Sequence, residues 1–348
     1  MNSSTYVGRL APSPTGALHL GNVRTFMIAW LRARSQGGKV IFRMEDLDHP
    51  KDKPGAAAAA VDDLRWLGFD WDEEYVQSER RAIYRKALAD LRSQPQPSTS
   101  TFSRVYPCVC SRKDVENAQS APHAGEQLHY PGTCRGRFAS WQAAQDVLVP
   151  VPRAVLVPVP RAVLGRGVTQ PSVRSPCWRF AVEPNTVVTF DDAFAGRYTQ
   201  NVAATLGDFP LARDEDGAGY TFACTVDDLL MGVTEVVRGD DLLAATPAQI
   251  LIAEALGRTP PSYCHVPLVV GPDGRRLAKR HGDTRIALYR EQGKSPEEIL
   301  GFLAASCGWA APGEKASLRD LIPRFDLKTI PREPFVITLK CDLTTLVR

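Results

Sequence analysis

The sequence has no long hydrophobic run and little net charge. None of its apolar stretches reaches the roughly 18 residues that a membrane-spanning helix needs. The start, MNSSTYVGRLAPSPTG, lacks the basic segment and long apolar stretch of a secretory signal. The 348 residues carry a formal net charge of only +3, which argues against a wholesale polyanion binder. We therefore expect a cytoplasmic protein with no membrane partner.

The cysteine content excludes a disulfide scaffold. Eight cysteines are too few for one in a chain of this length, and a cytoplasmic location would keep them reduced. Three of them are clustered at positions 108, 110 and 134. We interpret the five scattered ones as small buried apolar groups; these are Cys177, Cys224, Cys264, Cys307 and Cys341.

Strands and helices are predicted to alternate, which favours the α/β class. Residues 6–10 are apolar enough for a buried strand, 22–35 have helical spacing, and 39–46 form a second strand. Such a unit builds a parallel sheet. In the second half we expect a strand at 220–226 and a helix that Thr246 caps and Pro247 opens.

The loop PSPTGALHLGN, residues 12–22, joins the first strand to the first helix. A helix N-terminus presents unpaired backbone N–H groups, a natural seat for phosphate. Gly16 and Gly21 would let a ligand approach the backbone, and His19 could donate to phosphate oxygens. On spacing alone, a His19 satisfied within its own loop remains an alternative.

A second loop, RRLAKRHGD at residues 275–283, is strongly basic. With Lys279 at its centre it could close over a triphosphate and neutralise the charge that develops during transfer. In isolation, a solvated cationic loop remains the alternative.

Together, the two loops resemble the signatures of the glutamyl-type class I aminoacyl-tRNA synthetases. GRLAPSPTGALHLGN resembles their HIGH region, and RLAKR resembles their KMSKS loop. RMEDLD (43–48), GYTFACTVDD (219–228) and GVTEVVRGDDL (232–242) match the same family, so the resemblance covers roughly residues 5–310. It implies a doubly wound, Rossmann-like parallel sheet and an ATP-dependent ligase that activates glutamate with the help of Mg²⁺.

The resemblance also implies roles for particular residues. His19 and Lys279 would be catalytic at the phosphates of ATP, and Pro12, Gly21 and Asn22 would complete the ATP site. Glutamate would bind to Arg9, Ala11, Ser13, Glu45, Tyr220 and Arg238. The arginines suit its carboxylates and Glu45 suits its ammonium group. An alternative for Glu45 is pairing with Arg43, because strand alternation puts both on one face.

Two signature positions differ from the family pattern. Asn22 replaces the second histidine of HIGH, and Ala278 replaces the small polar residue before the signature lysine. Asn22 can still donate a hydrogen bond, so we expect a weakened interaction there. Ala278 loses a hydroxyl contact, which puts the rate in doubt more than the reaction.

Cys108, Cys110 and Cys134 supply three of the four donors that a tetrahedral structural zinc site needs. The pattern resembles the Cys-x-Cys and Tyr-x-x-x-Cys of the glutamyl-Q tRNA(Asp) synthetases, short relatives of the glutamyl enzymes, which implies Tyr130 as fourth ligand. His123 and His129 are rivals on chemical grounds, because imidazole binds zinc better than phenol does. Three unligated cysteines without a metal are a further alternative.

Only 65 residues follow Asp283, too few for the anticodon-reading helical domains of a full glutamyl-tRNA synthetase. The resemblance to the glutamyl-Q tRNA(Asp) synthetases then implies the first hypothesis, which is tRNA-independent activation of glutamate and its transfer to queuosine in the anticodon loop of tRNA(Asp), by a monomer. The alternatives are a truncated synthetase that charges tRNA(Glu), and a non-catalytic tRNA-binding paralogue.

We expect four segments. Residues 1–105 and 206–285 would form the two halves of the catalytic domain, the second with the KMSKS-like loop. Residues 106–205 would be a zinc-binding and acceptor-type insertion, and 286–348 a short helical C-terminal segment. Within the insertion, VPVPRAVL occurs twice in tandem over residues 149–164, and its prolines favour an extended or irregular stretch.

Overall fold

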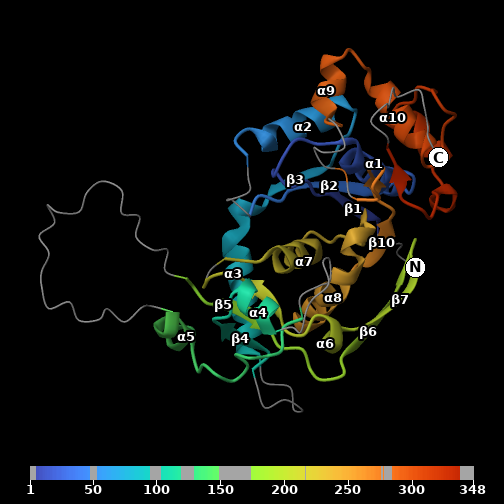
Figure 1. The fold of residues 1–348 in the computed structure, drawn as a ribbon. Helices are drawn as coiled ribbons and strands as arrows, with labels where there is room; N and C mark the ends of the chain where they lie inside the picture. The colour runs from blue at the N-terminus through green and yellow to red at the C-terminus, as the bar shows by residue number, and fades with distance from the viewer. Residues whose placement is uncertain are drawn as a thin grey trace, which may run out of the picture. The chain divides into compact units, whose positions relative to one another are not determined.

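The structure, a computed structural model, describes residues 5–47, 53–94, 103–118, 129–148, 174–215, 217–275, 277 and 284–337 (Figure 1). The tandem VPVPRAVL repeat, His123, Ala278, Lys279 and Cys341 lie outside these ranges. The chain divides into two compact units. Unit 1 contains residues 1–80, 188–200 and 223–348, and unit 2 contains residues 81–187 and 201–222. The predicted division into four segments remains a prediction.

Unit 1 begins with the predicted strand–helix–strand (Figure 1). Strand β1 (Val7–Leu10) pairs in parallel with β2 (Lys39–Met44), and helix α1 (Leu20–Arg34) connects them. Strand β3 (Glu73–Val76) continues the parallel sheet after α2 (Ala56–Trp66). Each strand–helix–strand connection thus gives parallel neighbours, as the alternation predicts.

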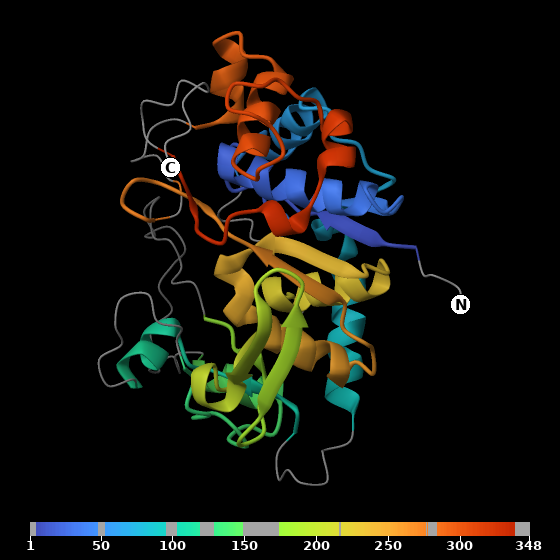
Figure 2. The same cartoon turned by 90° about the vertical axis from the view of Figure 1, so that its right-hand side faces the viewer.

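A second parallel set of strands completes the sheet region of unit 1. Strand β9 (Glu235–Gly239) pairs with β10 (Ser262–Val266), which pairs on its other side with β6 (Val187–Asp192). Figure 2 shows β7 (Gly196–Asn201) beside β6. The backbone N–H of Thr234, just before β9, donates to the carbonyl of Val7 at 2.9 Å, so the two sets meet at β1. The predicted α/β class with parallel strands is confirmed.

Two local predictions for the second half of the sequence are wrong. Residues 220–226 form the start of helix α7 (Tyr220–Leu230), not a strand. The run from Phe222 to Asp228 is continuously buried, polar residues included, so the sequence shows no helical period there. Helix α8 (Thr246–Ala255) begins at Thr246, so Ala245 occupies the N-cap position, and Pro247 lies in the first turn as predicted.

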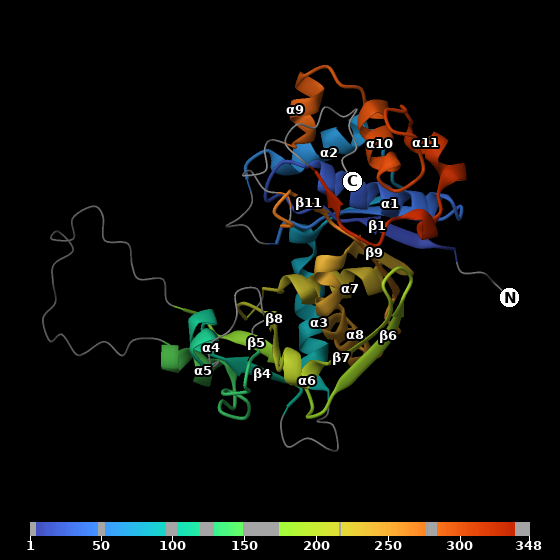
Figure 3. The same cartoon turned by 45° about the vertical axis from the view of Figure 1, so that its right-hand side comes forward.

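The C-terminal part of unit 1 is helical (Figure 3). Helices α9 (Ile286–Glu291) and α10 (Pro296–Ala305) lie within the predicted helical segment 286–348, and Ser295 caps α10. They are followed by α11 (Leu318–Leu321) and by β12 (Phe335–Val336), which pairs in parallel with β11 (Val269–Val270). Leu300, Leu303 and other apolar residues of α10 share one hydrophobic core with α1.

Unit 2 is built on an antiparallel sheet in the order β4 (Val105–Cys108), β5 (Cys177–Phe180) and β8 (Phe209–Ala212). Its helices are α3 (Arg81–Ser93), α4 (Arg112–Ala118), α5 (Trp141–Leu148) and α6 (Val202–Thr205). Short 3₁₀ helices elsewhere cover Gln77–Arg80, Asp240–Ala245, Ile322–Arg324 and Leu327–Thr329. In the described part of the chain, no helix is both long enough and apolar enough to cross a membrane.

Candidate active site and metal centre

His19 caps helix α1. Its backbone is extended, and its Nδ1 atom accepts hydrogen bonds from the backbone nitrogens of Gly21 (3.1 Å) and Asn22 (3.4 Å). The side-chain oxygen of Asn22 accepts in return from the backbone nitrogen of His19 at 3.2 Å. Because Nδ1 is an acceptor, a neutral His19 carries its proton on Nε2. His19 therefore presents a donor, as phosphate binding requires, although it is also satisfied within its own loop.

The predicted unpaired N–H groups at this helix end are not found. The N–H groups of Gly21 and Asn22 donate to the His19 side chain. The backbone nitrogen of Leu20 donates to the carbonyl of Thr284 and that of Val23 to the carbonyl of His19, both at 3.1 Å. The backbone N–H groups of the first turn are thus satisfied inside the protein. The side-chain oxygen of Asn22 accepts a hydrogen bond within the cap, so its amide N–H₂ is the group that can donate to a ligand.

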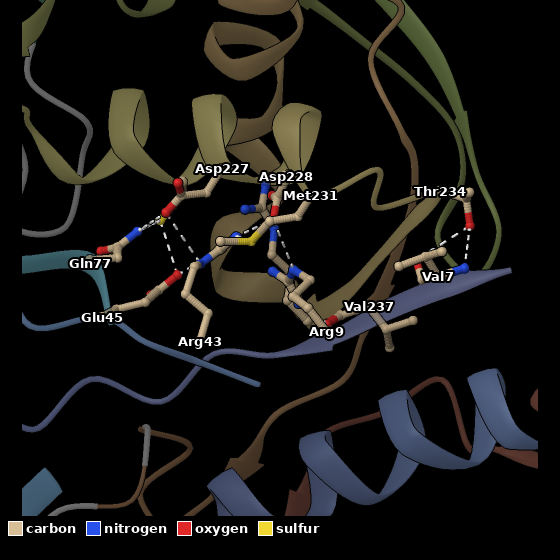
Figure 4. Close-up of polar contacts among 12 residues, drawn as sticks. Val7, Arg9, Arg43, Glu45, Gln77, Asp227, Asp228, Met231, Thr234 and Val237 are labelled. Carbon is tan, nitrogen blue, oxygen red and sulfur yellow. Dashed lines mark hydrogen bonds and ion pairs between the residues drawn. The ribbon is translucent and has the colours of Figure 1, made fainter. Parts of the chain in front are cut away.

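Arg43 lies at the centre of a buried charged cluster (Figure 4). Its Nη2 lies 3.0 Å from Glu45 Oε1, and its Nη1 lies 2.6 Å from Asp228 Oδ1. Its Nε lies 3.9 Å from Asp227. Burial alone would lower the pKa of Arg43, but the carboxylates of Asp228 and Glu45 raise it well above its usual value. Arg43 is therefore a permanent buried cation.

Further side chains complete the cluster. Asp227 accepts from Gln77 at 3.1 Å and from Arg80 at 2.8 Å. Arg9 donates through Nη1 to the carbonyl of Val237 at 2.8 Å, and its Nε lies 3.7 Å from Asp228 (Figure 4). This Nε is buried and has no hydrogen-bond partner among the described residues. A buried guanidinium N–H without a partner is costly, so a carboxylate ligand would be favoured here.

Glu45 pairs with Arg43, as the alternative interpretation predicts. It also accepts from the thiol of Cys224 at 3.1 Å. Burial and the neighbouring Glu45 raise the pKa of Cys224 well above its usual value, so the thiol stays protonated and donates. Asp227, Asp228 and Cys224 were not predicted as site residues, although all three lie in the motif GYTFACTVDD that carries the family resemblance.

The other residues predicted to bind glutamate or ATP lie in several elements. Arg238 lies on β9, and its Nε and Nη2 contact His265 (3.0 Å) and Thr246 (2.7 Å). The carbonyl of Pro12 accepts from the backbone nitrogen of Glu45 at 2.9 Å, which ties the signature loop to the end of β2. Ala11 is half-buried, Ser13 is exposed, and Tyr220 is the exposed first residue of α7.

Three cysteines gather in unit 2 as predicted. The Sγ atoms of Cys108, Cys110 and Cys134 all lie within 4.8 Å of one another, and those of Cys110 and Cys134 are 3.6 Å apart. The phenol oxygen of Tyr130 lies 3.3 Å from Cys108 Sγ and 3.6 Å from Cys110 Sγ. Gly132, with φ at 79°, makes the left-handed turn that brings Tyr130 and Cys134 together.

These separations fit one tetrahedral ion. Ligand atoms about 2.3 Å from a zinc ion would lie about 3.8 Å from each other. Within the described residues, Tyr130 is better placed than His129, whose Nε2 contacts the carbonyl of Ala203 at 3.0 Å. Hydrogen bonding to Cys108 and burial raise the pKa of Cys134 to about 12, so a metal would have to displace protons from this cluster.

A fourth thiol lies beside the cluster. Cys177 on β5 is the direct cross-strand partner of Cys108 on β4, and its hydrogen bond with Cys108 lowers the pKa of Cys177. Interpreting Cys177 as a buried apolar group was therefore wrong, because it is half-buried and has a polar neighbour. No local motif marks it, since 68 residues separate it from Cys108.

Arg179 adds a positive charge next to the cysteines. Its guanidinium carbon lies 3.8 Å from the centre of the Tyr130 ring, and its Nη1 donates to the carbonyl of Asp208 at 2.9 Å. Its Nε is buried without a hydrogen-bond partner among the described residues. A zinc ion with three thiolates carries a net charge of −1, which this buried cation would offset.

The parallel sheet, the capped signature helix and the cluster of buried arginines define a class I aminoacyl-tRNA synthetase catalytic domain. The chain matches the family described as tRNA synthetases class I (E and Q), catalytic domain, over residues 6–126 and 169–329, and it belongs to that family. It is 43% identical to the Glutamyl-Q tRNA(Asp) synthetase of Rhodopirellula baltica, over 96% of this chain and 97% of that protein. The predicted resemblance to this group of short synthetases is thereby confirmed.

Two further comparisons agree. The Glutamyl-Q tRNA(Asp) synthetase of Symbiobacterium thermophilum is 45% identical, over 94% of each chain. The crystal structure of the glutamate–tRNA synthetase from Elizabethkingia anophelis has the same fold, with a TM-score of 0.74 and 25% identity. That alignment covers 97% of this chain and 69% of that one.

Proposed function

We propose that this protein activates L-glutamate with ATP without tRNA and then transfers the glutamate to the queuosine base in the anticodon loop of tRNA(Asp). The observation that carries this proposal is the similarity to glutamyl-Q tRNA(Asp) synthetases. The sequence identity to one of them is 43%, in an alignment that covers 97% of that protein. We also propose that it acts as a monomer.

The reaction has two steps. A carboxylate oxygen of glutamate attacks the α-phosphorus of ATP, the bond to the bridging oxygen breaks, and pyrophosphate leaves. A hydroxyl of the cyclopentene diol of queuosine then attacks the carbonyl carbon of the glutamyl-adenylate and loses its proton, and AMP leaves. The protein contributes positioning and charge stabilisation in both steps.

The residues of the signature loops act on ATP in this proposal. The Nε2–H of His19 donates to a phosphate oxygen, and the cap on Nδ1 keeps the ring in the required tautomer and orientation. Lys279 neutralises the charge that develops on the leaving pyrophosphate. Pro12, Gly21 and Asn22 complete the ATP site, and Mg²⁺ bound with ATP supplies further charge neutralisation.

Glutamate binds beside the Arg43 cluster in this proposal. Three cations (Arg9, Arg43 and Arg80) face three carboxylates (Glu45, Asp227 and Asp228), so the cluster is balanced without a ligand. The net negative charge of glutamate therefore needs a further cation, which Arg238 provides. Arg9 and Arg238 take the carboxylates and Glu45 takes the ammonium group. Ala11, Ser13 and Tyr220 line the site.

Cys108, Cys110, Tyr130 and Cys134 hold a structural zinc ion in this proposal. Zinc would supply a cross-link between the end of β4 and the turn at residues 130–134, and no chemical step passes through it. The three closely spaced thiols and the phenol oxygen support this assignment.

ATP–pyrophosphate exchange with glutamate, measured with and without tRNA, tests the proposal. Exchange without tRNA, followed by transfer of labelled glutamate to tRNA(Asp) that contains queuosine, is the expected result. Lys279→Ala should abolish exchange, whereas Lys294→Ala, a lysine beside Glu298 on the surface of unit 1, should not. Exchange only with tRNA(Glu) would instead identify a truncated synthetase, and silence from folded, zinc-loaded protein would identify a non-catalytic paralogue.

A further inference from the structure

A buried carboxylate–imidazole pair lies behind Arg238. Asp192 ends strand β6 and His265 lies on the neighbouring strand β10, and both side chains are fully buried. Their Oδ2 and Nδ1 atoms are 2.6 Å apart. The carboxylate also accepts from the backbone nitrogens of Phe194 (3.0 Å) and Ala195 (2.7 Å). Asp192 is therefore held rigidly, and it in turn fixes the plane of the imidazole.

The opposite side of the ring faces Arg238. His265 Nε2 lies 3.0 Å from the Nε of Arg238, and Arg238 Nη2 lies 2.7 Å from the hydroxyl of Thr246. An arginine Nε–H can only donate, so Nε2 of His265 must be the acceptor. The single proton of the imidazole is then on Nδ1, directed at Asp192. Asp192 and Arg238 thus demand the same tautomer. The hydroxyl of Thr246, which lies 3.1 Å from Nε2, is compatible with it because a hydroxyl can also donate to that atom.

We propose that Asp192 and His265 are positioning residues that hold the guanidinium of Arg238 in the orientation that receives a carboxylate of glutamate. The inference rests on the proposed role of Arg238 in glutamate binding. With Nε engaged by His265 and Nη2 by Thr246, the guanidinium plane is fixed from one edge. The opposite edge, which contains Nη1, is the one assigned to the ligand.

The interposed imidazole has an electrostatic consequence. A carboxylate in direct contact with Arg238 would fix it equally well but would neutralise much of its charge. A neutral imidazole accepts the hydrogen bond and keeps the charge of Asp192 one ring further away. Burial lowers the pKa of His265, and the hydrogen bond to Asp192 and the charge of Arg238 act in opposite directions on it. The ring therefore stays neutral, and Arg238 keeps its attraction for an anion.

The isosteric change Asp192→Asn provides the test. The amide N–H₂ of the new side chain would donate to Nδ1, which moves the ring proton to Nε2 and sets it against the Nε–H of Arg238. We expect the KM for glutamate in pyrophosphate exchange to rise about tenfold or more, with the KM for ATP and the kcat at saturating glutamate changed less than about threefold. Glu235→Gln is the matched control, because Glu235 is a buried carboxylate on β9 paired with Tyr6 and Arg32. It should leave both KM values unchanged.

A second measurement does not depend on activity. In protein labelled with ¹⁵N-histidine, the Nε2 of His265 should have the chemical shift of an unprotonated nitrogen, and Asp192→Asn should move the proton to it. A protonated Nε2 in the wild-type protein would overturn the proposal even if exchange is normal. Equal rises in the KM values for glutamate and ATP would also overturn it. The wild-type protein could show the predicted tautomer but no glutamate-dependent exchange. In that case the proposed function is wrong, whereas the hydrogen-bond arrangement of Asp192, His265 and Arg238 is confirmed.

Discussion

The Nδ1 atom of His19 lies 3.1 Å from the backbone nitrogen of Gly21, and a β-carbon at position 21 would lie 3.1 Å from the same atom. It would also lie 3.0 Å from Cε1 of the ring. Gly21 therefore serves the imidazole that caps α1, where the sequence suggested that it makes room for a ligand. The signature histidine and glycine form one local structure, in which the cap fixes the orientation of the ring.

Replacing His19 by asparagine should separate its capping role from its catalytic role. Asparagine is among the best N-cap residues, so His19→Asn should keep the free energy of unfolding within about 1 kcal/mol of the wild type. It lacks the Nε2–H donor, and loss of one such donor lowers kcat by roughly 10²–10³. Pyrophosphate exchange and urea unfolding, measured on the same sample, check both parts. Exchange within about threefold of wild type would contradict the role of Nε2.

Gly21→Ala should impair pyrophosphate exchange although His19 itself is unchanged. The new methyl group pushes against the imidazole and against Val269, whose Cβ would lie 3.4 Å away, so the ring must shift. A displacement of about 1 Å in a catalytic group can lower activity by about 100-fold. The control is the same substitution in the His19→Asn background, where the ring that the Cβ would meet is absent and the further loss of kcat should be small. Equal fold losses of kcat in the two backgrounds would show that the steric contact does not matter.

Arg43→Met should strongly destabilise the fold. It removes the fully buried cation that pairs with Glu45 and Asp228, and breaking a buried ion pair from one side costs about 3–5 kcal/mol. The control is Arg324→Met, which removes an exposed arginine that pairs with Glu314 in the same unit. Urea unfolding should show a large loss for the first variant and little change for the second. Similar losses in both would mean that the charged cluster contributes no more than a surface pair.

The sequence was enough to predict the parallel sheet and the cysteine cluster, because each depends on a local pattern. Strand β1, helix α1 and strand β2 follow one another within forty residues, and Cys108 and Cys110 are separated by one residue. Helix α7 was missed because its buried residues are consecutive, so no face of the helix is visible in the sequence.

Contacts between distant segments could not be predicted. Cys177 meets Cys108 only because β4 and β5 pair in one particular register, which nothing near either residue specifies. The chain from Asp192 to Arg238 likewise depends on the order of β6, β10 and β9 in the sheet. The hydrogen bond from Leu20 at the start of α1 was missed for the same reason, because its acceptor, Thr284, is distant in the sequence. The local part of this cap, a His19 satisfied within its own loop, was one of the two alternatives that the sequence left open.

Purified protein should contain one zinc ion, and Tyr130→Phe should bind it more weakly. In the proposed site the phenol oxygen is the fourth donor, so its removal would leave three ligands. We expect the zinc dissociation constant, measured by competition with a chromogenic chelator, to rise about 10- to 100-fold. Cys177→Ser is the informative control, because its thiol lies beside Cys108 but outside the group of three. A larger effect from Cys177→Ser than from Tyr130→Phe would make Cys177 the fourth ligand.

The stability of the protein should fall as the pH decreases from 7 to 5, in part because of His265. Burial lowers the pKa of His265 in the folded state, whereas in the unfolded chain it titrates near about 6.5. Below that pH the unfolded state binds a proton that the folded state rejects, so the free energy of unfolding decreases as the pH falls toward the folded pKa. The pKa of Asp192 is also lowered, since hydrogen bonds from His265 and the backbone outweigh its burial, but its contribution is lost only below about pH 4. His265→Gln removes the imidazole titration, so urea unfolding of this variant should depend less on pH between 7 and 5 than that of the wild type. Identical pH dependence in the two proteins would show that His265 takes up its proton equally in both states.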